Sequence, residues 1–446
     1  MQSFLLTAAL ASAAFAASPI TVKVSDNIRY QTYDGTGISE AFQRSLVLHL
    51  LDPPTRNAAL DLLFTDRGAG MTILRNGLGS SPTDPFDLMK SICPVAPASN
   101  SSEAIARGVH TIYANAWSAD GYMKTNGNDD YGGYLCGVTN ASCATGDWRQ
   151  SYANKIVRYI QDYRRNGIKI DYVGFLNEPD QNTTYASMLS DGQQAADFIK
   201  ILRPTLDRAG VKTKIACCDG AGWDQNRQRL TGIQAAGEEH NLGLVTAHGY
   251  SSAPNTPYNT PLKTWVTEWS TFDATNFDWY NSTTGSYKQS FGLTWANHIQ
   301  EAFQYSNVSA FLYWWGAANA TDNESLLIVN GTSELKVTKR LYAMAHWGSK
   351  FVRKDAVRID AAVSANGVAA LNATAFRNTD GSVAVQIINN SDSPQSVSVS
   401  GFAHDCQVET FLTNQRYDLK QGNAKNTKGA AQSTVPARSL FSFVGR

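Results

Sequence analysis

Charge is scarce in this sequence, and neither sign dominates. Charged residues make up 17% of the 446 residues, and 38 Lys and Arg balance 38 Asp and Glu, so the formal net charge is zero. A neutral surface has no long-range attraction for nucleic acid or for an anionic membrane. The composition therefore disfavours nucleic-acid and membrane partners, and it favours a neutral polymer.

Cysteine is also scarce, and its spacing excludes a common metal site. The six Cys residues include no Cys-x-x-Cys pair, so a structural zinc site is not expected. Cys136 and Cys143 bracket a short loop, and we expect a disulfide between them. Cys217 and Cys218 are adjacent, and they are either buried thiols or a vicinal disulfide. No phosphate-binding loop is found, so we expect neither a metal nor another cofactor.

Long apolar runs are missing beyond the N-terminus. The run from Phe4 to Phe15 has the length of a secretory h-region, and Ala14-Phe15-Ala16 matches a small-x-small cleavage site. Residues 1–17 are therefore predicted to be a signal peptide, and the protein is predicted to be secreted and extracellular. No other stretch reaches the roughly 18 apolar residues of a membrane span. Ten Asn-x-Ser/Thr sequons agree with secretion: Asn100, Asn140, Asn182, Asn281, Asn307, Asn319, Asn323, Asn330, Asn372 and Asn389.

Aromatic residues, by contrast, are plentiful. They make up 11% of the chain and include 10 Trp and 19 Tyr. Such side chains fill large cores, and they also stack on the apolar faces of sugar rings. The composition agrees with a carbohydrate-binding protein without requiring one.

Short apolar strands alternate with helical stretches over residues 32–350. This alternation is typical of a parallel sheet, and eight such units predict a (β/α)8 barrel. A doubly wound sheet is disfavoured because no Gly-x-Gly-x-x-Gly follows the first strand. The strands are expected at Gly35–Ile38, Met71–Leu74, Thr111–Asn115, Tyr172–Asn177, Lys214–Cys217, Leu244–His248, Thr264–Glu268 and Ala310–Trp314. Helices are expected at Tyr152–Tyr163, Gly192–Ala209, Trp295–Tyr305 and Val337–Phe351.

The pattern changes after the barrel region to short alternating strands with polar turns. Strands are expected at Ala362–Ala370, Ser382–Asn389, Gln395–Val399, Gln407–Phe411 and Ser439–Val444. They predict a side β-sandwich made of residues 351–446, which the alternating segment 18–31 joins. No linker-like tract separates the two domains, so we expect them to pack rigidly, and we expect a monomer.

Two glutamates interrupt apolar strands where those strands end. Glu178 follows the fourth expected strand in Asn177-Glu178-Pro179, and Glu268 ends the seventh in Thr267-Glu268-Trp269. Barrel enzymes carry their active sites at the carboxyl ends of the strands. Two carboxylates that flank a glycosidic bond are what glycoside hydrolysis requires. The pair therefore predicts a glycosidase, whereas a serine hydrolase is disfavoured because no Gly-x-Ser-x-Gly elbow is present.

These motifs together resemble glycoside hydrolase family 30, a family of retaining enzymes built on a (β/α)8 barrel with a side β-domain. The resemblance is carried by the two glutamate motifs, by the aromatic strand Leu312–Gly316, and by the run Gly37–Arg44. It covers nearly the whole chain after the signal peptide. Within the family, the run Gly37–Arg44 is similar to that of the fungal xylanases of subfamily 7.

The resemblance implies roles for the two glutamates and their neighbours. Glu178 would be the acid/base, which must carry a proton when substrate binds, and Glu268 would be the ionised nucleophile. Retention implies carboxyl groups roughly 5 to 5.5 Å apart. Arg75 would lie beside the nucleophile, and Tyr250 would donate a hydrogen bond to it. His248 would either join them or be a satisfied barrel histidine.

The resemblance also implies substrate contacts. Asn177 would bind the sugar 2-hydroxyl, while Trp117 and either Trp314 or Trp315 would form apolar walls. Strand alternation lets only one of the two adjacent Trp residues face inward, and we favour Trp314.

The prediction of which polymer is cleaved depends on a single arginine. By its place in the motif, Arg44 would bind the carboxylate of a glucuronic acid branch on xylan, because a guanidinium matches a planar carboxylate. The first hypothesis is therefore a glucuronoxylan-cleaving endo-β-1,4-xylanase. Another family 30 glycanase, such as a β-1,6-galactanase or β-1,6-glucanase, is the second hypothesis. A non-catalytic carbohydrate-binding barrel is the third, and the two glutamates argue against it.

Overall fold

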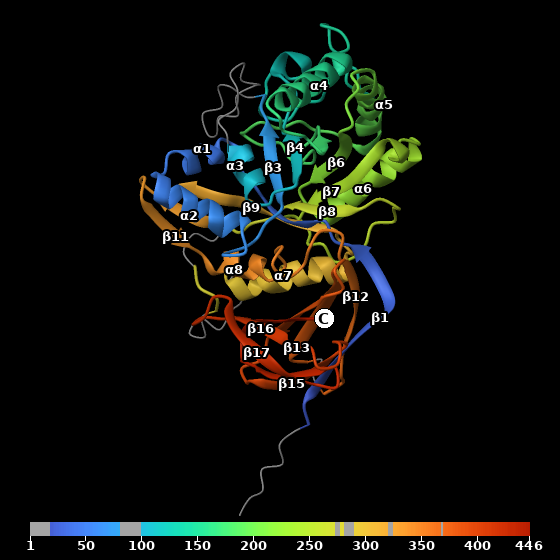
Figure 1. Ribbon diagram of the computed structural model, residues 1–446. Coiled ribbons are helices and arrows are strands. Elements are labelled where there is room, and N and C mark those ends of the chain that lie inside the picture. Colours follow the sequence, from blue (N-terminus) through green and yellow to red (C-terminus); the bar gives the residue numbers. More distant parts are fainter. Residues whose placement is uncertain (1–17, 81–99, 273–276, 281–289, 320–323, 367–368) are drawn as a thin grey trace, which may run out of the picture.

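The protein consists of a barrel and a side β-domain that lies against its lower end (Figure 1). The computed structural model describes residues 18–80, 100–272, 277–280, 290–319, 324–366 and 369–446. The predicted signal peptide lies outside these residues, so secretion stays a prediction. Among the helices within the described ranges, none is both long and apolar enough to span a bilayer.

The predicted (β/α)8 barrel is confirmed. Eight parallel strands pair in chain order, and the last strand also pairs with the first, which closes the ring. The strands are β2 (Gly35–Ser39), β3 (Ile73–Leu78), β4 (Thr111–Ala116), β5 (Tyr172–Gly174), β6 (Lys214–Gly220), β7 (Leu242–His248), β8 (Thr264–Glu268) and β9 (Ala310–Asn319). Each overlaps one expected strand. A hairpin that was not expected, β10 (Ser325–Asn330) with β11 (Glu334–Val337), extends the sheet beyond β9.

Helices surround the barrel and cover the outer faces of its strands (Figure 1). In α4, Tyr152, Ile156 and Ile160 are buried on one face, as the helical period predicts. The expected helix Val337–Phe351 is shorter than predicted, because the chain turns after Ala345 and still buries Phe351. The helices are α1 (Arg44–His49), α2 (Pro53–Phe64), α3 (Asn100–Ala106), α4 (Arg149–Arg165), α5 (Gly192–Arg208), α6 (Trp223–Ala235), α7 (Gly292–Tyr305) and α8 (Lys339–Ala345), with short 3-10 turns at Gly121–Met123 and Glu239–Asn241.

The side domain is a closed set of nine strands around its own apolar core. Its N-terminal strand β1 pairs with β12 and β15, so the segment before the barrel belongs to this domain, as predicted. The expected strand Ala362–Ala370 is wrong, because β12 ends at Val363 and β13 starts at Leu371 after a turn. The strands are β1 (Ile20–Thr32), β12 (Val357–Val363), β13 (Leu371–Arg377), β14 (Val383–Asn389), β15 (Gln395–Ser400), β16 (Val408–Thr413), β17 (Lys420–Thr427), β18 (Ala430–Val435) and β19 (Ser439–Gly445).

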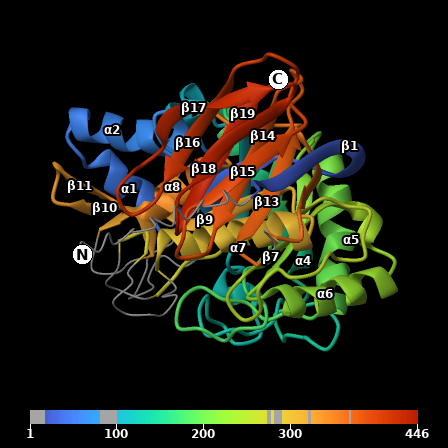
Figure 2. The same cartoon turned by 90° about the horizontal axis from the view of Figure 1, so that it is seen from below.

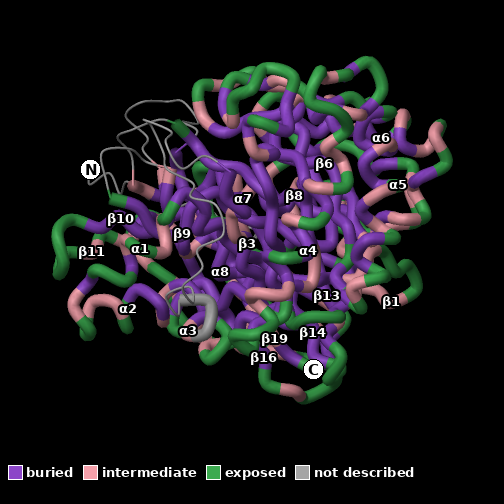
Figure 3. The backbone as a smooth tube through the Cα atoms, turned by 90° about the horizontal axis from the view of Figure 1, so that it is seen from above, coloured by how far each residue is buried: buried purple, intermediate pink, exposed green. Residues whose placement is uncertain are grey.

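Some apolar residues of the side domain also pack into the core of the barrel. Helices α7 and α8 lie between the barrel strands and the side domain (Figures 1 and 2). The ring of Tyr33 contacts Phe303 of α7 and Phe376 of β13, each with ring centroids 5.5 Å apart. One cluster of buried apolar residues runs from the barrel through these rings into β14 and β19. In Figure 3 the buried chain fills the middle of the molecule and the exposed residues line its rim.

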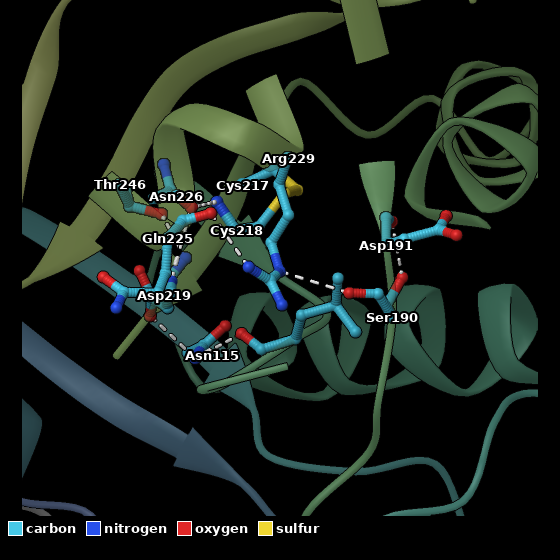
Figure 4. Close-up of a disulfide and its surroundings, with 12 residues drawn as sticks. Asn115, Ser190, Asp191, Cys217, Cys218, Asp219, Gln225, Asn226, Arg229 and Thr246 are labelled. Carbon is cyan, nitrogen blue, oxygen red and sulfur yellow. Dashed lines mark hydrogen bonds between the residues drawn. A yellow bond between two sulfur atoms is a disulfide. The ribbon is translucent and has the colours of Figure 1, made fainter. Parts of the chain in front are cut away.

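The cysteines pair in two ways. The predicted disulfide Cys136–Cys143 is confirmed. The sequence left Cys217 and Cys218 either as buried thiols or as a vicinal disulfide. They form a vicinal disulfide near the end of β6 (Figure 4). Cys406 is a free thiol in the side domain, and Cys93 lies outside the described residues.

Candidate active site

A cavity of about 420 Å³ opens at the carboxyl ends of the barrel strands. Both predicted glutamates line it, together with aromatic and small polar side chains. Its lining residues are Phe42, Trp117, Asn177, Glu178, Gln181, Thr183, Tyr185, Ala221, Tyr250, Ser251, Glu268, Phe272, Trp314, Trp315 and Glu324.

Glu178 is held in an unusual backbone conformation four residues after β5. Its φ of 45° lies in the left-handed region, which is costly for a residue with a side chain. Its N–H donates to the carbonyl of Asp219 at 2.8 Å, which holds this conformation. The Tyr185 hydroxyl donates to Oε2 of the carboxyl group at 2.9 Å, and Nδ1 of His248 lies 3.1 Å from Oε1. The carboxyl group therefore has a defined orientation at the cavity.

Glu268 is the last residue of β8 and is buried. Arg75 of β3 forms a short ion pair with its Oε2, and the Tyr250 hydroxyl donates to its Oε1 at 3.0 Å. Burial raises the pKa of Glu268 above its ordinary value, and the positive charges of His248 and Arg75 limit this rise. The predicted neighbours Arg75 and Tyr250 thus lie where the sequence placed them.

Asp219 is the central acceptor of the cluster, and the sequence analysis did not identify it. Its Oδ2 accepts hydrogen bonds from Arg75 at 2.8 Å, Tyr113 at 2.9 Å and Asn115 at 2.8 Å. Its Oδ1 accepts from the Thr267 hydroxyl at 2.7 Å. It directly follows the vicinal disulfide, and Figure 4 shows it between Asn115 and Thr246.

The sequence position of Asp219 matches the pattern that predicts a site residue, although the sequence analysis did not use it. It is a polar residue just after the apolar segment of β6, which is the same pattern that revealed Glu178 and Glu268. Burial alone would raise the pKa of its carboxyl group, but Arg75 and His248 hold that pKa well below its ordinary value. Asp219 is therefore an ionised anchor for the two cations.

His248, the last residue of β7, lies beneath the cavity and does not line it. Its side chain is fully buried among Glu178, Glu268 and Asp219. Burial alone would lower the pKa of His248, but these carboxylates raise it to about 10. One nitrogen of His248 and one oxygen each of Glu178 and Glu268 lie within 4.8 Å of one another, a spacing that a metal ion can use. The charges of His248 and Arg75 already face these oxygens, which disfavours a further cation.

Arg75 connects the charged cluster to the cavity wall. It is fully buried, and its Nη2 donates to Oδ1 of Asn177 at 2.6 Å. Its guanidinium carbon lies 4.5 Å from the ring centroid of Trp117. The carbonyl oxygen of Asn177 is thus held by Arg75, and Asn177 itself lines the cavity.

The aromatic wall differs from the prediction in one respect. Both Trp314 and Trp315 line the cavity, with ring centroids 4.7 Å apart, although strand alternation predicts that only one faces inward. The register of β9 against β2 shifts here, since Ile38 pairs with Tyr313 and the next residue of β2 pairs with Trp315. Trp314 is the extra residue of this bulge, and a bulge breaks the alternation of side chains.

Arg44 lies at the start of α1, next to this wall. Its guanidinium carbon is 3.9 Å from the ring centroid of Trp315, and its Nη1 donates to the carbonyl of Phe42 at 3.1 Å. The predicted branch-binding arginine therefore lies against a ring that lines the cavity.

Two further aromatic residues at the cavity were not predicted. Tyr185 contacts Glu178, and Phe272 lies 5.6 Å from the ring of Tyr250 with 66% of its surface exposed. Both follow strand ends in loops, where no periodic pattern marks them.

Comparison with known proteins agrees with this geometry. Residues 96–228 match the model of the glycosyl hydrolase family 30 TIM-barrel domain, and residues 355–443 match that of the family 30 beta sandwich domain. The catalytic domain of family 30 xylanase C from Talaromyces cellulolyticus is 38% identical, with a TM-score of 0.86. The alignment covers 96% of this chain and 100% of that one. The chain belongs to glycoside hydrolase family 30.

Other relatives of this family 30 glycoside hydrolase differ in named activity. An endo-1,6-beta-D-glucanase of Neurospora crassa is 26% identical over 52% of this chain, and one of Trichoderma harzianum is 27% identical over 38%. The alignments span about half the length of the first relative and 39% of the second. A family 30 subfamily 8 xylanase of Clostridium acetobutylicum shares the fold, at 20% identity and a TM-score of 0.74 over 96% of this chain and 99% of that one.

Proposed function

We propose that this glycoside hydrolase is a monomeric, retaining endo-β-1,4-xylanase that cleaves xylan carrying glucuronic acid branches. The observation that carries the chemistry is the convergence of Glu178 and Glu268 on one cavity, with an oxygen of each within 4.8 Å of the other. This spacing supports retention, since inverting enzymes hold their carboxyl groups roughly 6.5 to 9.5 Å apart. Xylan is supported by the similarity to xylanase C over its full length.

In the first step, an oxygen of Glu268 attacks the anomeric carbon, and the bond from that carbon to the glycosidic oxygen breaks. The departing oxygen takes the proton of Glu178, so the products are a glycosyl ester on Glu268 and a carboxylate on Glu178. Arg75 and Tyr250 keep Glu268 ionised and oriented before the attack.

In the second step, water attacks the same carbon and gives a proton to Glu178. The ester bond breaks, Glu268 recovers its negative charge, and the two steps together leave the anomeric configuration unchanged. The Tyr185 hydroxyl and Nδ1 of His248 fix the carboxyl group of Glu178, which acts in both steps.

The cavity wall would bind the sugar through stacking on aromatic rings and through the side-chain amide of Asn177. Trp117 and Trp314 offer rings against its apolar faces. Because Arg75 holds the carbonyl oxygen of Asn177, the amide N–H group is the part that would reach the sugar 2-hydroxyl. Phe272, which is exposed at the rim, offers a further stacking face.

Substitution of each glutamate tests the assignment. We expect Glu268→Gln to abolish hydrolysis of glucuronoxylan and Glu178→Gln to slow it by about 10² to 10⁴-fold. A glycoside with a dinitrophenolate leaving group, which needs no proton, should keep a rapid first step with Glu178→Gln. Glu334→Gln, at an exposed position on β11, is the control. Hydrolysis that persists with Glu268→Gln would refute the nucleophile assignment and the proposed function with it.

Arg44 is proposed to bind the branch carboxylate. We expect Arg44→Ala to lower kcat/KM on glucuronoxylan by about ten-fold or more, the worth of a charged hydrogen-bonded pair, and to leave unbranched xylan nearly unaffected. Arg164→Ala, at an exposed position on α4, should change neither. Equal losses on both substrates would contradict branch recognition.

A β-1,6-glucanase is the second candidate, because curated relatives named for that activity align with much of the chain. A panel of glucuronoxylan, unbranched xylan, β-1,6-glucan and β-1,6-galactan separates the candidates. Mass spectrometry of the products gives the linkage, the branch requirement and the chain length together. Binding without release of any product would instead favour a non-catalytic carbohydrate-binding barrel.

A further inference from the structure

His248 faces three carboxyl groups that come from three parts of the barrel. Its Nδ1 lies 3.1 Å from Oε1 of Glu178, and its Nε2 lies 3.6 Å from Oε2 of Glu268 and 3.7 Å from Oδ2 of Asp219. The imidazole is fully buried and does not line the cavity. Any effect of His248 on the reaction must therefore act through the two glutamates.

The charges of this cluster balance before and after the first step of the proposed reaction. In the resting enzyme Asp219 and Glu268 are negative, Arg75 and His248 are positive, and Glu178 carries its proton. In the glycosyl-enzyme Glu268 is a neutral ester and Glu178 has lost its proton. One negative charge has moved from Glu268 to Glu178, and the sum is zero in both states.

We propose that His248 is a positively charged positioning residue that stabilises the negative charge on Glu268 before glycosylation and on Glu178 afterwards. The proposal rests on the roles given above to the two glutamates. Its ring nitrogens lie near both carboxyl groups, so the same cation serves both states. Arg75 forms ion pairs with Glu268 and Asp219, but within the described part of the chain it forms no ion pair or hydrogen bond with Glu178.

The surroundings of His248 keep it charged at neutral pH. Glu178 faces it from the loop after β5, Asp219 from β6 and Glu268 from β8, while Arg75 forms ion pairs with Glu268 and Asp219. The Tyr250 ring packs edge-on at 5.9 Å. These three carboxyl groups outweigh the cost of burial and raise the pKa of His248 to about 10.

Nitrogen NMR of the wild-type protein tests the charge directly. The chain has seven His residues, and the spectrum of His248→Asn identifies the signals of His248 by their loss. We expect both ring nitrogens of His248 to be protonated at pH 8 in the free enzyme. A neutral imidazole at that pH would overturn the proposal.

Kinetics of His248→Asn test the consequence. The Asn amide is able to donate to Glu178 as Nδ1 does, but it carries no charge. We expect the acid limb of the kcat/KM profile to move up by about one pH unit or more, because losing a nearby cation favours protonated Glu268. A 2-fluoroglycosyl-enzyme, made with the sugar that the polysaccharide panel identifies, should also reactivate about ten-fold more slowly at acidic pH, because losing the same cation favours protonated Glu178, which cannot accept the proton of water.

His346→Asn is the matched control, because His346 is fully buried but lies at the boundary with the side domain. It should keep the wild-type acid limb and reactivation rate. Peptide mapping of the fluoroglycosyl-enzyme checks the proposed function separately: label on a residue other than Glu268 refutes that function. With Glu268 labelled, a folded His248→Asn variant with an unchanged acid limb or an unchanged reactivation rate refutes the charge-sharing role. If this variant does not fold, single substitutions of the other six His residues assign the signals of His248 by elimination, and the wild-type NMR result decides.

Discussion

At the scale of single residues, Asp219 holds the donors on which the two glutamates depend. Its carboxylate accepts hydrogen bonds from Arg75, Tyr113, Asn115 and Thr267, while its backbone carbonyl fixes Glu178. It is fully buried, so its ionised state needs all of these partners. Its task is to place Arg75 and His248, and through them the carboxylates that face the cavity.

Replacing Asp219 by Asn should therefore affect both stability and rate. One partner of a buried charged network is lost, so we expect the free energy of unfolding to fall by about 3 to 5 kcal/mol. We also expect kcat to fall by about 100-fold or more, because Arg75 no longer has a fixed position. Urea unfolding and steady-state kinetics measure the two effects, with the exposed Asp224→Asn as the control. Wild-type kcat in a folded Asp219→Asn variant would contradict the anchoring role.

One sequon shows that a short sequence pattern does not predict whether its asparagine is accessible. Asn389 has the Asn-x-Ser pattern, yet its side chain is fully buried. Its Nδ2 donates to the carbonyls of Ser393, Val435 and Pro436. A sequon is read from three residues, whereas access to it depends on strands that pair from elsewhere in the chain.

At the scale of elements, the barrel strands were predicted because their interiors are apolar and their ends are polar. Strands of the side domain that lack this contrast were missed. In β17, the segment KQGNAKNT alternates in burial although it has almost no apolar residues. It becomes a strand by pairing with β16 and β18, and that pairing is a tertiary contact.

Helix α5 shows the opposite case, because its local sequence is sufficient to predict where the helix begins. Asp191 and Gln194 form a reciprocal capping box, with the Asp191 carboxylate accepting from the Gln194 N–H at 2.8 Å and the Gln194 side chain accepting from the Asp191 N–H at 3.0 Å. The start of the helix can be predicted without knowing its tertiary neighbours, because the cap lies within four residues of sequence.

Removing this cap should have a small and local cost. We expect Asp191→Ala to lower the free energy of unfolding by about 1 kcal/mol, with catalysis unchanged. Lys200→Ala, at an exposed position in the same helix, should change stability by less than about 0.5 kcal/mol. Chemical denaturation of the three proteins measures the difference, and equal midpoints for Asp191→Ala and wild type would show that the cap is not stabilising.

At the scale of the whole molecule, a buried histidine joins the barrel to the side domain. The ring nitrogens of His346, which follows α8, lie 2.6 Å from the Ser442 hydroxyl and 2.8 Å from the Thr413 hydroxyl. Burial lowers the pKa of His346 to about 3, so it is neutral in the folded protein across the ordinary pH range. The boundary between the domains therefore contains a buried histidine that stays neutral in the folded state and resists protonation.

The sign of the resulting pH dependence follows from linkage. The unfolded histidine takes up a proton below its ordinary pKa of 6.5, whereas the folded one does so only near 3. The contribution of His346 to the free energy of unfolding is thus complete above pH 6.5. It is lost as the pH falls toward 3, by about 1.4 kcal/mol per pH unit. We expect His346→Gln to lose less stability than wild type between pH 7 and pH 5 in urea unfolding. Parallel losses in the two proteins would contradict this assignment.

The sequence by itself determined the barrel, the side domain, the two glutamates and the disulfide Cys136–Cys143. These features depend on periodicity, on polar residues at strand ends or on short spacing, all of which are local. The tertiary structure decided the bulge that turns both Trp314 and Trp315 toward the cavity, because a bulge is a property of strand pairing. It also brought His248, Arg75 and Asp219 into one charged cluster, because side chains on different strands meet only when the ring closes.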